Sequence, residues 1–300
     1  MKNSYYMLII LISAVLFQGS GTFQNNDWIN TNGAFGGSVW ALTVTGQGNL
    51  LAGTLKNGVY YSADNAQNWE QTNLDNITVY DFALTDGLAF AASKEGIYQS
   101  TNDGKDWSLL DSELNGVSIQ SIHAVEGTLF ALNLTDGIFR STDLGNTWTI
   151  NNEGIPLPFG ISLASNDGNI FAGINNGVFQ SSDNGDTWRR LNTNFSNVRA
   201  NSIIANANGI YVGTQDGIYH SRTDGDTWTD IGDGLNNREI YDLAYSRGTM
   251  YAGTREGVYS SSNNGRSWKL SGWAENAVYS IAAFNDWVFI GGNSGIFYRN

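Results

Sequence analysis

The chain has 300 residues, of which only 14% are charged, and its formal net charge at pH 7 is −13. Nucleic acids and anionic membrane surfaces both select basic faces, so this balance excludes them as partners. Cysteine is absent, which excludes disulfides, thiol catalysis and Cys-ligated zinc. With 36 glycines and 2 prolines, the composition favours many short strands joined by hairpins.

The N-terminal residues have the pattern of a secretory signal peptide. Lys2 precedes an apolar run from Tyr5 to Phe17, and small residues follow it up to Gly21. The run is shorter than the ~20 residues that a bilayer-spanning helix needs. We therefore expect a signal peptide over residues 1–21 and a secreted or periplasmic domain over 22–300, with no membrane insertion after cleavage. A buried first strand or an uncleaved anchor is the alternative.

A repeat of about 40 residues runs through the rest of the chain. Seven tryptophans recur at spacings of 41, 38, 41, 40, 40 and 40 residues, namely Trp28, Trp69, Trp107, Trp148, Trp188, Trp228 and Trp268. A marker glycine precedes each of the last six by 11 residues, as Gly58 precedes Trp69. Gly295 has no tryptophan after it, and Trp28 has no such glycine before it. The seventh repeat is therefore split between the two ends of the chain.

Each repeat predicts four short strands. In the first complete unit these are Val39–Val44, Leu50–Thr54, Val59–Ser62 and a strand opened by Trp69. Seven such units predict an all-β, seven-bladed β-propeller of four-stranded antiparallel blades. The N-terminal strand would complete the last blade and close the ring, which removes an exposed sheet edge. We expect both central residues of the turn ending at the marker glycine to have positive φ.

The motif Ser-x-Asp-x-Gly-x-x-Trp lies between the third and fourth strands. It is complete in Ser141–Trp148 and Ser181–Trp188, whereas Ala66, Asn102, Thr223 and Asn263 depart from it elsewhere. We expect a structural role, in which the carboxylate accepts backbone N–H groups and the tryptophan is buried. The residues assigned to this role are Asp64, Asp143, Asp183, Trp69, Trp107, Trp148, Trp188, Trp228 and Trp268. Calcium loops need more ligands, so neither a metal nor a cofactor is expected.

The motif resembles the Asp-box, or bacterial neuraminidase repeat, over essentially all of residues 22–300. The resemblance implies a propeller like those of sialidases, xyloglucanases, sortilin-type receptors and photosystem II assembly factor-like proteins. In these families the box lies away from the active or binding site, so it implies a fold and not a chemistry. The sequence lacks the Arg-Ile-Pro segment of sialidases, and one propeller lacks the cleft between the two propellers of xyloglucanases.

Residues that could carry catalysis are sparse. His123 and His220 fall in different units and have no metal-ligand spacing. Arginines such as Arg140, Arg222 and Arg266 fall in or beside the motif hairpins, at the wrong end of the blade for a substrate. We therefore expect no enzyme; the alternative is a glycoside hydrolase or sialidase-like activity.

Alignment of the inner strands gives a column of candidate ligand-binding residues. Aromatic residues occupy one position in units one, two, six and seven, which are consecutive in a closed ring, and aspartate follows in two of these units. The six candidates are Trp40, Tyr80, Asp81, Tyr241, Asp242 and Tyr279. Rings beside carboxylates suit sugars or peptide side chains. Alternatively, the rings fill gaps between blades and the carboxylates accept neighbouring backbone N–H groups.

These residues would lie at the mouth of the channel, on the face that carries the loops between units. Those loops add Trp273, Phe195, Arg199, Arg238 and Glu239 to the same face. We expect a monomeric, non-catalytic recognition module that binds a protein segment or a glycan there. If the protein were a hydrolase, Asp81 and Asp242 would be its first candidate pair. A third alternative is an assembly or stability factor without a small ligand.

Overall fold

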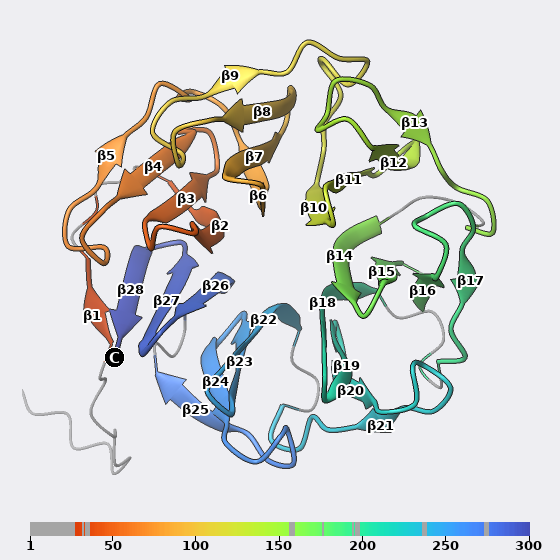
Figure 1. The fold of residues 1–300 in the computed structure, drawn as a ribbon. Helices are drawn as coiled ribbons and strands as arrows, with labels where there is room; N and C mark the ends of the chain where they lie inside the picture. Colours follow the sequence, from red (N-terminus) through yellow and green to blue (C-terminus); the bar gives the residue numbers. More distant parts are fainter. Residues whose placement is uncertain are drawn as a thin grey trace, which may run out of the picture.

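The computed structural model describes residues 28–31, 33, 37–155, 160–175, 177–193, 195, 199–235, 239–272 and 276–300. The expected signal peptide lies outside these residues. The described chain forms seven four-stranded antiparallel sheets, arranged as blades around a central axis (Figure 1). The predicted seven-bladed, all-β propeller is confirmed. No helix that could cross a membrane occurs in the described part of the chain.

The strands follow the chain outward from the axis in each of the first six blades. Blade 1 contains β2 (Val39–Val44), β3 (Leu50–Thr54), β4 (Val59–Ser62) and β5 (Glu70–Gln71). Blade 2 contains β6 (Val79–Thr85), β7 (Leu88–Ser93), β8 (Gly96–Ser100) and β9 (Ser108–Leu109). Blade 3 contains β10 (Ser121–Val125), β11 (Thr128–Asn133), β12 (Gly137–Ser141) and β13 (Thr149–Ile150). Blade 4 contains β14 (Gly160–Asn166), β15 (Asn169–Ile174), β16 (Gly177–Ser181) and β17 (Arg189–Arg190).

The remaining blades repeat this order and close the ring. Blade 5 contains β18 (Ala200–Asn206), β19 (Gly209–Thr214), β20 (Gly217–Ser221) and β21 (Thr229–Asp230). Blade 6 contains β22 (Ile240–Ser246), β23 (Thr249–Thr254), β24 (Gly257–Ser261) and β25 (Lys269–Gly272). Blade 7 contains β26 (Val278–Phe284), β27 (Trp287–Gly292), β28 (Gly295–Arg299) and, outermost, β1 (Ile29–Asn30).

Blade 7 joins the two ends of the chain, as the split repeat predicts. Ile29 pairs with Tyr298 and Asn30 with Phe297 in an antiparallel ladder. Beside the axis, β26 of blade 7 lies next to β2 of blade 1, so the last and first blades are neighbours (Figure 1). Phe297 and Tyr298 of β28 are therefore paired on both sides, and β1 becomes the outer edge of this blade.

The turn prediction was wrong in its location. After β7, Ser93 pairs with Gly96 across a two-residue turn, so the marker glycine is the first residue of the next strand and is not a central turn residue. Its φ is +125°, while Lys94 and Glu95 have no positive φ. The Ser93 hydroxyl holds this turn, accepting from the Glu95 N–H at 3.1 Å and donating to the Gly96 carbonyl at 2.8 Å.

Paired positive φ values occur instead in the turn between the first two strands of blades 2, 3, 4 and 6. Asp86 and Gly87, between β6 and β7, have φ of +51° and +76°. The tight two-residue hairpin with both central residues left-handed therefore connects the inner strand to its neighbour.

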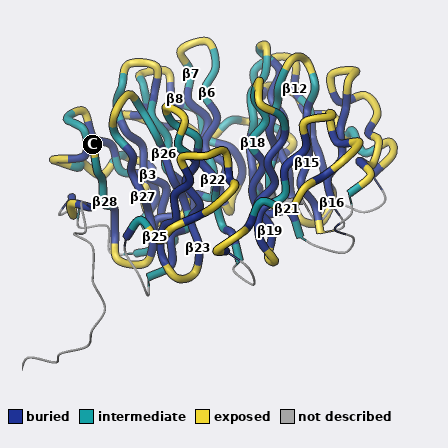
Figure 2. Tube along the Cα trace, turned by 90° about the horizontal axis from the view of Figure 1, so that it is seen from below, coloured by how far each residue is buried: buried dark blue, intermediate teal, exposed yellow. Residues whose placement is uncertain are grey.

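The core lies in layers between adjacent blades. One such cluster joins Leu51 and Val59 of blade 1 to Val79 and Trp107 of blade 2. The three inner strands of each blade are largely buried, whereas the loops at both ends are exposed (Figure 2). The short outermost strands, such as β5 and β9, are also exposed. A glycine in the second strand lets the next blade approach closely, because a Cβ on Gly53 would lie 2.8 Å from Cγ1 of Val79. Since each buried side chain contributes about 1.5–3 kcal/mol, these layers hold the ring together.

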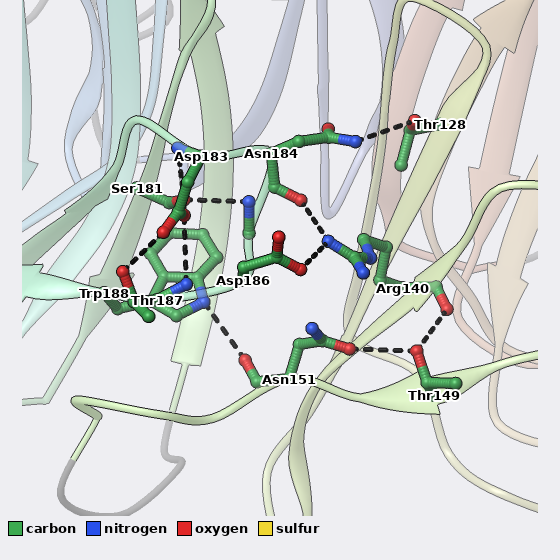
Figure 3. Close-up of polar contacts among 11 residues, drawn as sticks. Thr128, Arg140, Thr149, Asn151, Ser181, Asp183, Asn184, Asp186, Thr187 and Trp188 are labelled. Carbon is green, nitrogen blue, oxygen red and sulfur yellow. Dashed lines mark hydrogen bonds and ion pairs between the residues drawn. The ribbon is translucent and has the colours of Figure 1, made fainter.

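The motif loops share one hydrogen-bond pattern. In blade 4, the Ser181 hydroxyl donates to Asp183 Oδ1 at 2.7 Å and accepts from the Gly185 N–H at 2.8 Å (Figure 3). Asp183 Oδ1 also accepts from the Thr187 N–H at 2.9 Å. Hydrogen bonds from Thr187 and Ser181 lower the pKa of Asp183 to about 2. The predicted carboxylate role in the loop is therefore observed here.

The departures from the motif keep the same backbone contact. Asn102, Thr223 and Asn263 each accept the N–H of the residue four positions later, at 2.9, 2.9 and 3.1 Å. A side-chain oxygen of any of these residues thus suffices for the loop. Ala66 takes the glycine position at φ +67°, a conformation that an L-residue rarely adopts.

The motif tryptophans link each loop to its surroundings in two ways. Trp107 donates its Nε1–H to the Gly104 carbonyl of its own loop at 2.9 Å. Trp188 donates instead to the Asn151 carbonyl of the preceding blade at 3.0 Å (Figure 3). Trp28, which opens β1, likewise donates to Ser271 of blade 6 at 3.1 Å. Some of these rings therefore also fasten neighbouring blades to each other.

Candidate functional site

A bulge at the start of the inner strands positions the candidate site. The pairing shifts at the second strand residue in six of the seven blades, for example between Val39 and Ala41 of β2. The extra residue opposes no partner, so the bulge re-aims its side chain. Trp40, Tyr80, Tyr241 and Tyr279 all occupy this position and line a central pocket.

The four aromatic rings form one continuous row. The ring centroids of Tyr80 and Trp40 are 5.7 Å apart, those of Trp40 and Tyr279 6.1 Å, and those of Tyr279 and Tyr241 5.3 Å. All three pairs are tilted, within the range at which rings attract each other. Trp40 is 37% exposed, and the tyrosines are partly exposed. The aromatic residues that align in the inner strands of blades 2, 1, 7 and 6 thus form a single surface.

The row borders a pocket of about 570 Å³ at the end of the channel nearest the loops between blades. This volume lies within the range of about 300–1,000 Å³ typical of small-ligand sites. The aromatic residues and Asp81 and Asp242 line one side. The other lining residues are Ala41, Leu42, Gln120, Ser121, Leu134, Ser162, Leu163, Asn201, Ser202, Ile203, Leu243 and Ser280.

Asp81 connects blade 2 to blade 3. Its Oδ1 accepts from the Phe82 N–H at 2.8 Å, and its Oδ2 accepts from the Ser121 hydroxyl at 2.8 Å and the Ile122 N–H at 3.0 Å. Burial raises the pKa of Asp81 to about 6, against the lowering effect of these three donors.

Asp242 connects blade 6 to both of its neighbours. Its Oδ1 accepts from the Ser202 hydroxyl of blade 5 at 3.0 Å and from the Leu243 N–H at 2.8 Å. Its Oδ2 accepts from the Ile281 N–H of blade 7 at 2.8 Å. Burial raises the pKa of Asp242 to about 7, and the negative charge of Asp81 contributes to this rise. Both carboxylates therefore do accept neighbouring backbone N–H groups, as the structural alternative expects.

Three buried oxygen atoms in the pocket wall are left without a hydrogen-bond partner among the described residues. They are Oγ of Ser162, Oγ of Ser280 and Oδ1 of Asn201. The amide nitrogen of Asn201 donates to the Ile240 carbonyl at 2.8 Å, which leaves its oxygen as an acceptor. Buried polar atoms are normally paired. The hydroxyls of Ser162 and Ser280 instead lie close to Gly173 and Gly291 of the second strands, where a Cβ would be 2.8 and 2.7 Å away. The alignment could not indicate that these atoms lack a partner, because hydrogen bonding at these positions depends on the neighbouring blades.

Other residues that the sequence places on this face have different roles. Phe195 is 4% exposed and stacks on Tyr219 with ring centroids 4.2 Å apart, so it belongs to the core and not to a contact surface. Arg199 pairs with Glu239 at 2.7 Å. Trp273 and Arg238 lie outside the described residues.

The two histidines are embedded in structural contacts. His123 shares a hydrogen bond of 2.8 Å with the Ser165 hydroxyl, and burial lowers its pKa to about 4. His220 stacks on Tyr211 with centroids 4.1 Å apart and donates from Nε2 to the Asn208 carbonyl at 2.9 Å. Within the ranges that the structure describes, His, Asp and Glu side chains form no group of three that could hold a metal.

Comparison with known proteins supports the propeller fold. A family model described as the DUF6242 beta propeller domain matches residues 165–279, which is less than half of the chain. No curated protein matches the chain.

Among solved structures, the extracellular domain of the putative one-component system BT4673 from B. thetaiotaomicron is similar, with a TM-score of 0.78 and 17% identity. The match covers 90% of this chain but only 39% of that chain, so this chain spans well under half of its neighbour's length. YCF48 from Cyanidioschyzon merolae has a TM-score of 0.72 at 16% identity, over 90% of this chain and 97% of that chain. A second YCF48 structure, bound to D1 peptide, is similar at 17% identity.

The GH74 xyloglucanase from Xanthomonas campestris has a TM-score of 0.73 at 13% identity, over 90% of this chain and 53% of that chain. At such low sequence identities, the similarity shows that the proteins share a fold and shows nothing about a shared function. Extracellular, peptide-bound and catalytic proteins share this fold, so the function has to be argued from the site.

Proposed function

We propose that this protein is an extracytoplasmic, non-catalytic recognition module of the Asp-box type, which binds a segment of another protein at the central pocket. The observation that carries the proposal is the continuous row of four rings, from Tyr80 to Tyr241, beside the pocket. Aromatic rings offer a large contact area at low conformational cost, which suits recognition of an extended ligand. The expected signal peptide over residues 1–21 supports the extracytoplasmic location.

A protein ligand has some support from the comparisons, since the YCF48 neighbour has been observed with D1 peptide. A glycan is the competing ligand, because sugar rings also stack on aromatic faces. An assembly factor with this fold would be a special case of protein binding.

The geometry gives a hydrolase less support. A glycosidase needs two carboxyl groups with pKa values set apart, one protonated and one ionised. Here burial raises the pKa of both Asp81 and Asp242, to about 6 and about 7. Each carboxyl group also accepts three hydrogen bonds from the inner strands, which tie it to the scaffold.

The test is a ligand search with matched variants. Residues 22–300 are used as bait in a pull-down from the producing organism and on a glycan array, beside the variants Trp40→Ala and Tyr241→Ala. We expect a protein partner that both variants lose and a blank glycan array. Trp287→Ala is the control, because Trp287 begins β27 at the opposite end of blade 7 and contacts Phe289 and Tyr298.

Three results would contradict the proposal. Capture that is equal in wild type and in both pocket variants would show that the aromatic row is not the binding surface. Binding on the glycan array, lost with Trp40→Ala, would replace the protein ligand by a glycan. Turnover of an oligosaccharide that Asp242→Asn abolishes would make the protein an enzyme.

A further inference from the structure

We propose that the pocket recognises an organic cation, namely the ammonium of a lysine or the guanidinium of an arginine side chain on the bound protein segment. This inference rests on the proposed function and specifies the chemistry of its ligand. It follows from three independent features of the pocket: the polar atoms of its wall, the faces of its rings, and its charge.

The polar groups of the wall include two carboxylates and no positively charged side chain among the described residues. The lining residues that the structure describes include no Lys, Arg or His. Asn201 is 8% exposed and its buried Oδ1 has no hydrogen-bond partner, while Ser280 is 4% exposed and its Oγ lies close to Gly291 of β27. Amide oxygens can only accept, so a ligand at Asn201 has to bring an N–H or O–H donor. An ammonium group carries three such donors and a guanidinium five.

The aromatic row adds a second source of attraction for a cation. A ring face carries negative potential, and it attracts an ammonium or guanidinium within about 6 Å of the centroid, most strongly when the ring is tryptophan. Trp40 lies in the middle of the row, between Tyr80 and Tyr279. Four rings from consecutive blades can therefore pack along the apolar stem of a lysine or arginine and still contact its charged end.

Charge decides between a cation and a neutral ligand. Asp81 and Asp242 line the same pocket, and the charge of Asp81 helps to raise the pKa of Asp242. When ionised, the two carboxylates each accept three hydrogen bonds, but no positive charge among the lining residues balances them. A cation between them relieves this cost, whereas a neutral sugar does not. The formal net charge of −13 attracts the same ligands at long range.

A side-chain cation fits better than an amino sugar. Lysine and arginine have an apolar stem and one polar end, which matches rings on one side and acceptors deeper in the channel. A sugar ring carries hydroxyl groups around its whole rim, and each of them needs its own partner.

The inference predicts that acid weakens binding, since the cation prefers the ionised carboxylates. Asp81 faces Ser121 and Ile122 of blade 3, and Asp242 faces Ser202 of blade 5 and Ile281 of blade 7. The nearby ionisable groups are the pocket tyrosines, the Arg199–Glu239 pair and Arg255 close to Tyr241. Tyrosine and arginine stay protonated between pH 5 and 8, so the two aspartates dominate the change in this range.

The experiment measures binding of fluorescein-labelled pentapeptides to residues 22–300 by fluorescence anisotropy. The central residue is lysine or arginine, or one of their neutral analogues, norleucine and citrulline. We expect the cationic peptides to bind at least about ten-fold more tightly than the neutral ones, and to lose this advantage between pH 8 and pH 5. Asp81→Asn combined with Asp242→Asn should abolish the preference for cations.

Matched variants separate the pocket from the acidic surface. Asp86→Asn combined with Glu126→Gln makes the same change of charge at exposed turns at the other end of the blades, and should leave the preference unchanged. Trp40→Leu keeps an apolar wall and should weaken cationic peptides more than neutral ones. It remains a test even if the double aspartate variant does not fold.

The outcomes distinguish this inference from the proposed function. Equal binding of norleucine and lysine peptides, lost in both cases with Trp40→Ala, would overturn the inference that the pocket recognises a cation. The proposal that the pocket is a recognition site would still stand. If oligomers of glucosamine bound more tightly than every peptide, the inference that the cation is a protein side chain would be overturned. Binding of no probe, together with partner capture that the pocket variants do not change, would overturn both proposals.

Discussion

The two ends of the channel axis differ in what changes from blade to blade. At the motif-loop end, different side chains make the same contact: Asp183, Asn102 and Thr223 all accept the N–H four residues later, each at 2.9 Å. At the pocket end, one backbone bulge presents different side chains, such as Trp40, Tyr279 and Asn201. Contacts that are repeated from blade to blade therefore maintain the fold. Side chains that vary among the blades on the same backbone form the surface available for recognition.

The largest expected effect contrasts two tryptophans from these two ends. Trp188 is 4% exposed and donates to the preceding blade, whereas Trp40 is 37% exposed. We expect Trp188→Ala to lower the free energy of unfolding by about 3–5 kcal/mol. Trp40→Ala should cost about 1 kcal/mol or less, because most of its surroundings are solvent or neighbouring rings. Urea titrations of both variants measure the difference, and equal losses would remove the contrast.

The next effect concerns the glycine of the motif. A Cβ on Gly104 would lie 2.3 Å from Cδ2 of Leu51 in blade 1, and the φ of Gly104 is +88°. Overpacking and backbone strain together should make Gly104→Ala cost about 2–4 kcal/mol. Ala66 already occupies this position in blade 1, so Ala66→Gly should change stability by about 1 kcal/mol or less. Thermal unfolding of the two variants measures both changes in stability. If Gly104→Ala left the stability unchanged, the packing argument would be contradicted.

A smaller effect is the pH dependence of the free energy of unfolding. It again distinguishes the pocket end from the motif-loop end. The folded-state pKa of Asp81 and Asp242, about 6 and about 7, exceeds the unfolded value of about 3.9. The native state thus binds more protons between about pH 4 and 7, and stability falls as pH rises through this window. We expect the protein to lose about 1–3 kcal/mol between pH 5 and pH 8 from these two groups.

The matched variants for this effect are Asp242→Asn and Asp183→Asn. The first should reduce the difference in stability between pH 5 and pH 8. The second should leave it unchanged, because hydrogen bonds lower the pKa of Asp183 to about 2 and its contribution is lost only as pH falls below about 4. Urea midpoints at both pH values provide the measurement, and an identical change in the two variants would show that only total charge matters.

The smallest effect involves an ion pair at the motif-loop end. Arg140 donates to Asp186 at 2.6 Å and to the Asn184 carbonyl at 2.7 Å, which connects blades 3 and 4 (Figure 3). Asp186 is largely exposed, so Arg140→Ala should cost no more than about 1 kcal/mol. Arg247→Ala removes a pair exposed on both sides and should cost still less. Since both pairs join neighbouring blades, a larger loss for Arg247→Ala would contradict the expected effect of burial on the strength of the ion pair.

The sequence was sufficient for the fold and for the juxtaposition of the four aromatic rings, because both depend on a repeat. The split seventh unit predicts the pairing of Ile29 with Tyr298, and the aligned inner strands predict the row around Trp40. Two features could not be predicted. The bulge is a property of the ladder between two strands, and the partners of Asp81 and Asp242 come from other blades. The alignment compares blades with each other but says nothing about contacts between them.

The pairing of β1 with β28 has a consequence for the order of folding. Among the described strands, the outermost strand of blade 7, β1, is the first to be made on the ribosome, and its partner β28 is the last. Contacts between distant parts of a chain are slow to form because the intervening loop must close. Blades 1–6 can each assemble from continuous stretches of chain, whereas blade 7 must wait for the final strand. We expect truncation before Gly295 to leave an open ring of blades with unpaired edges, which would make the released chain prone to aggregation.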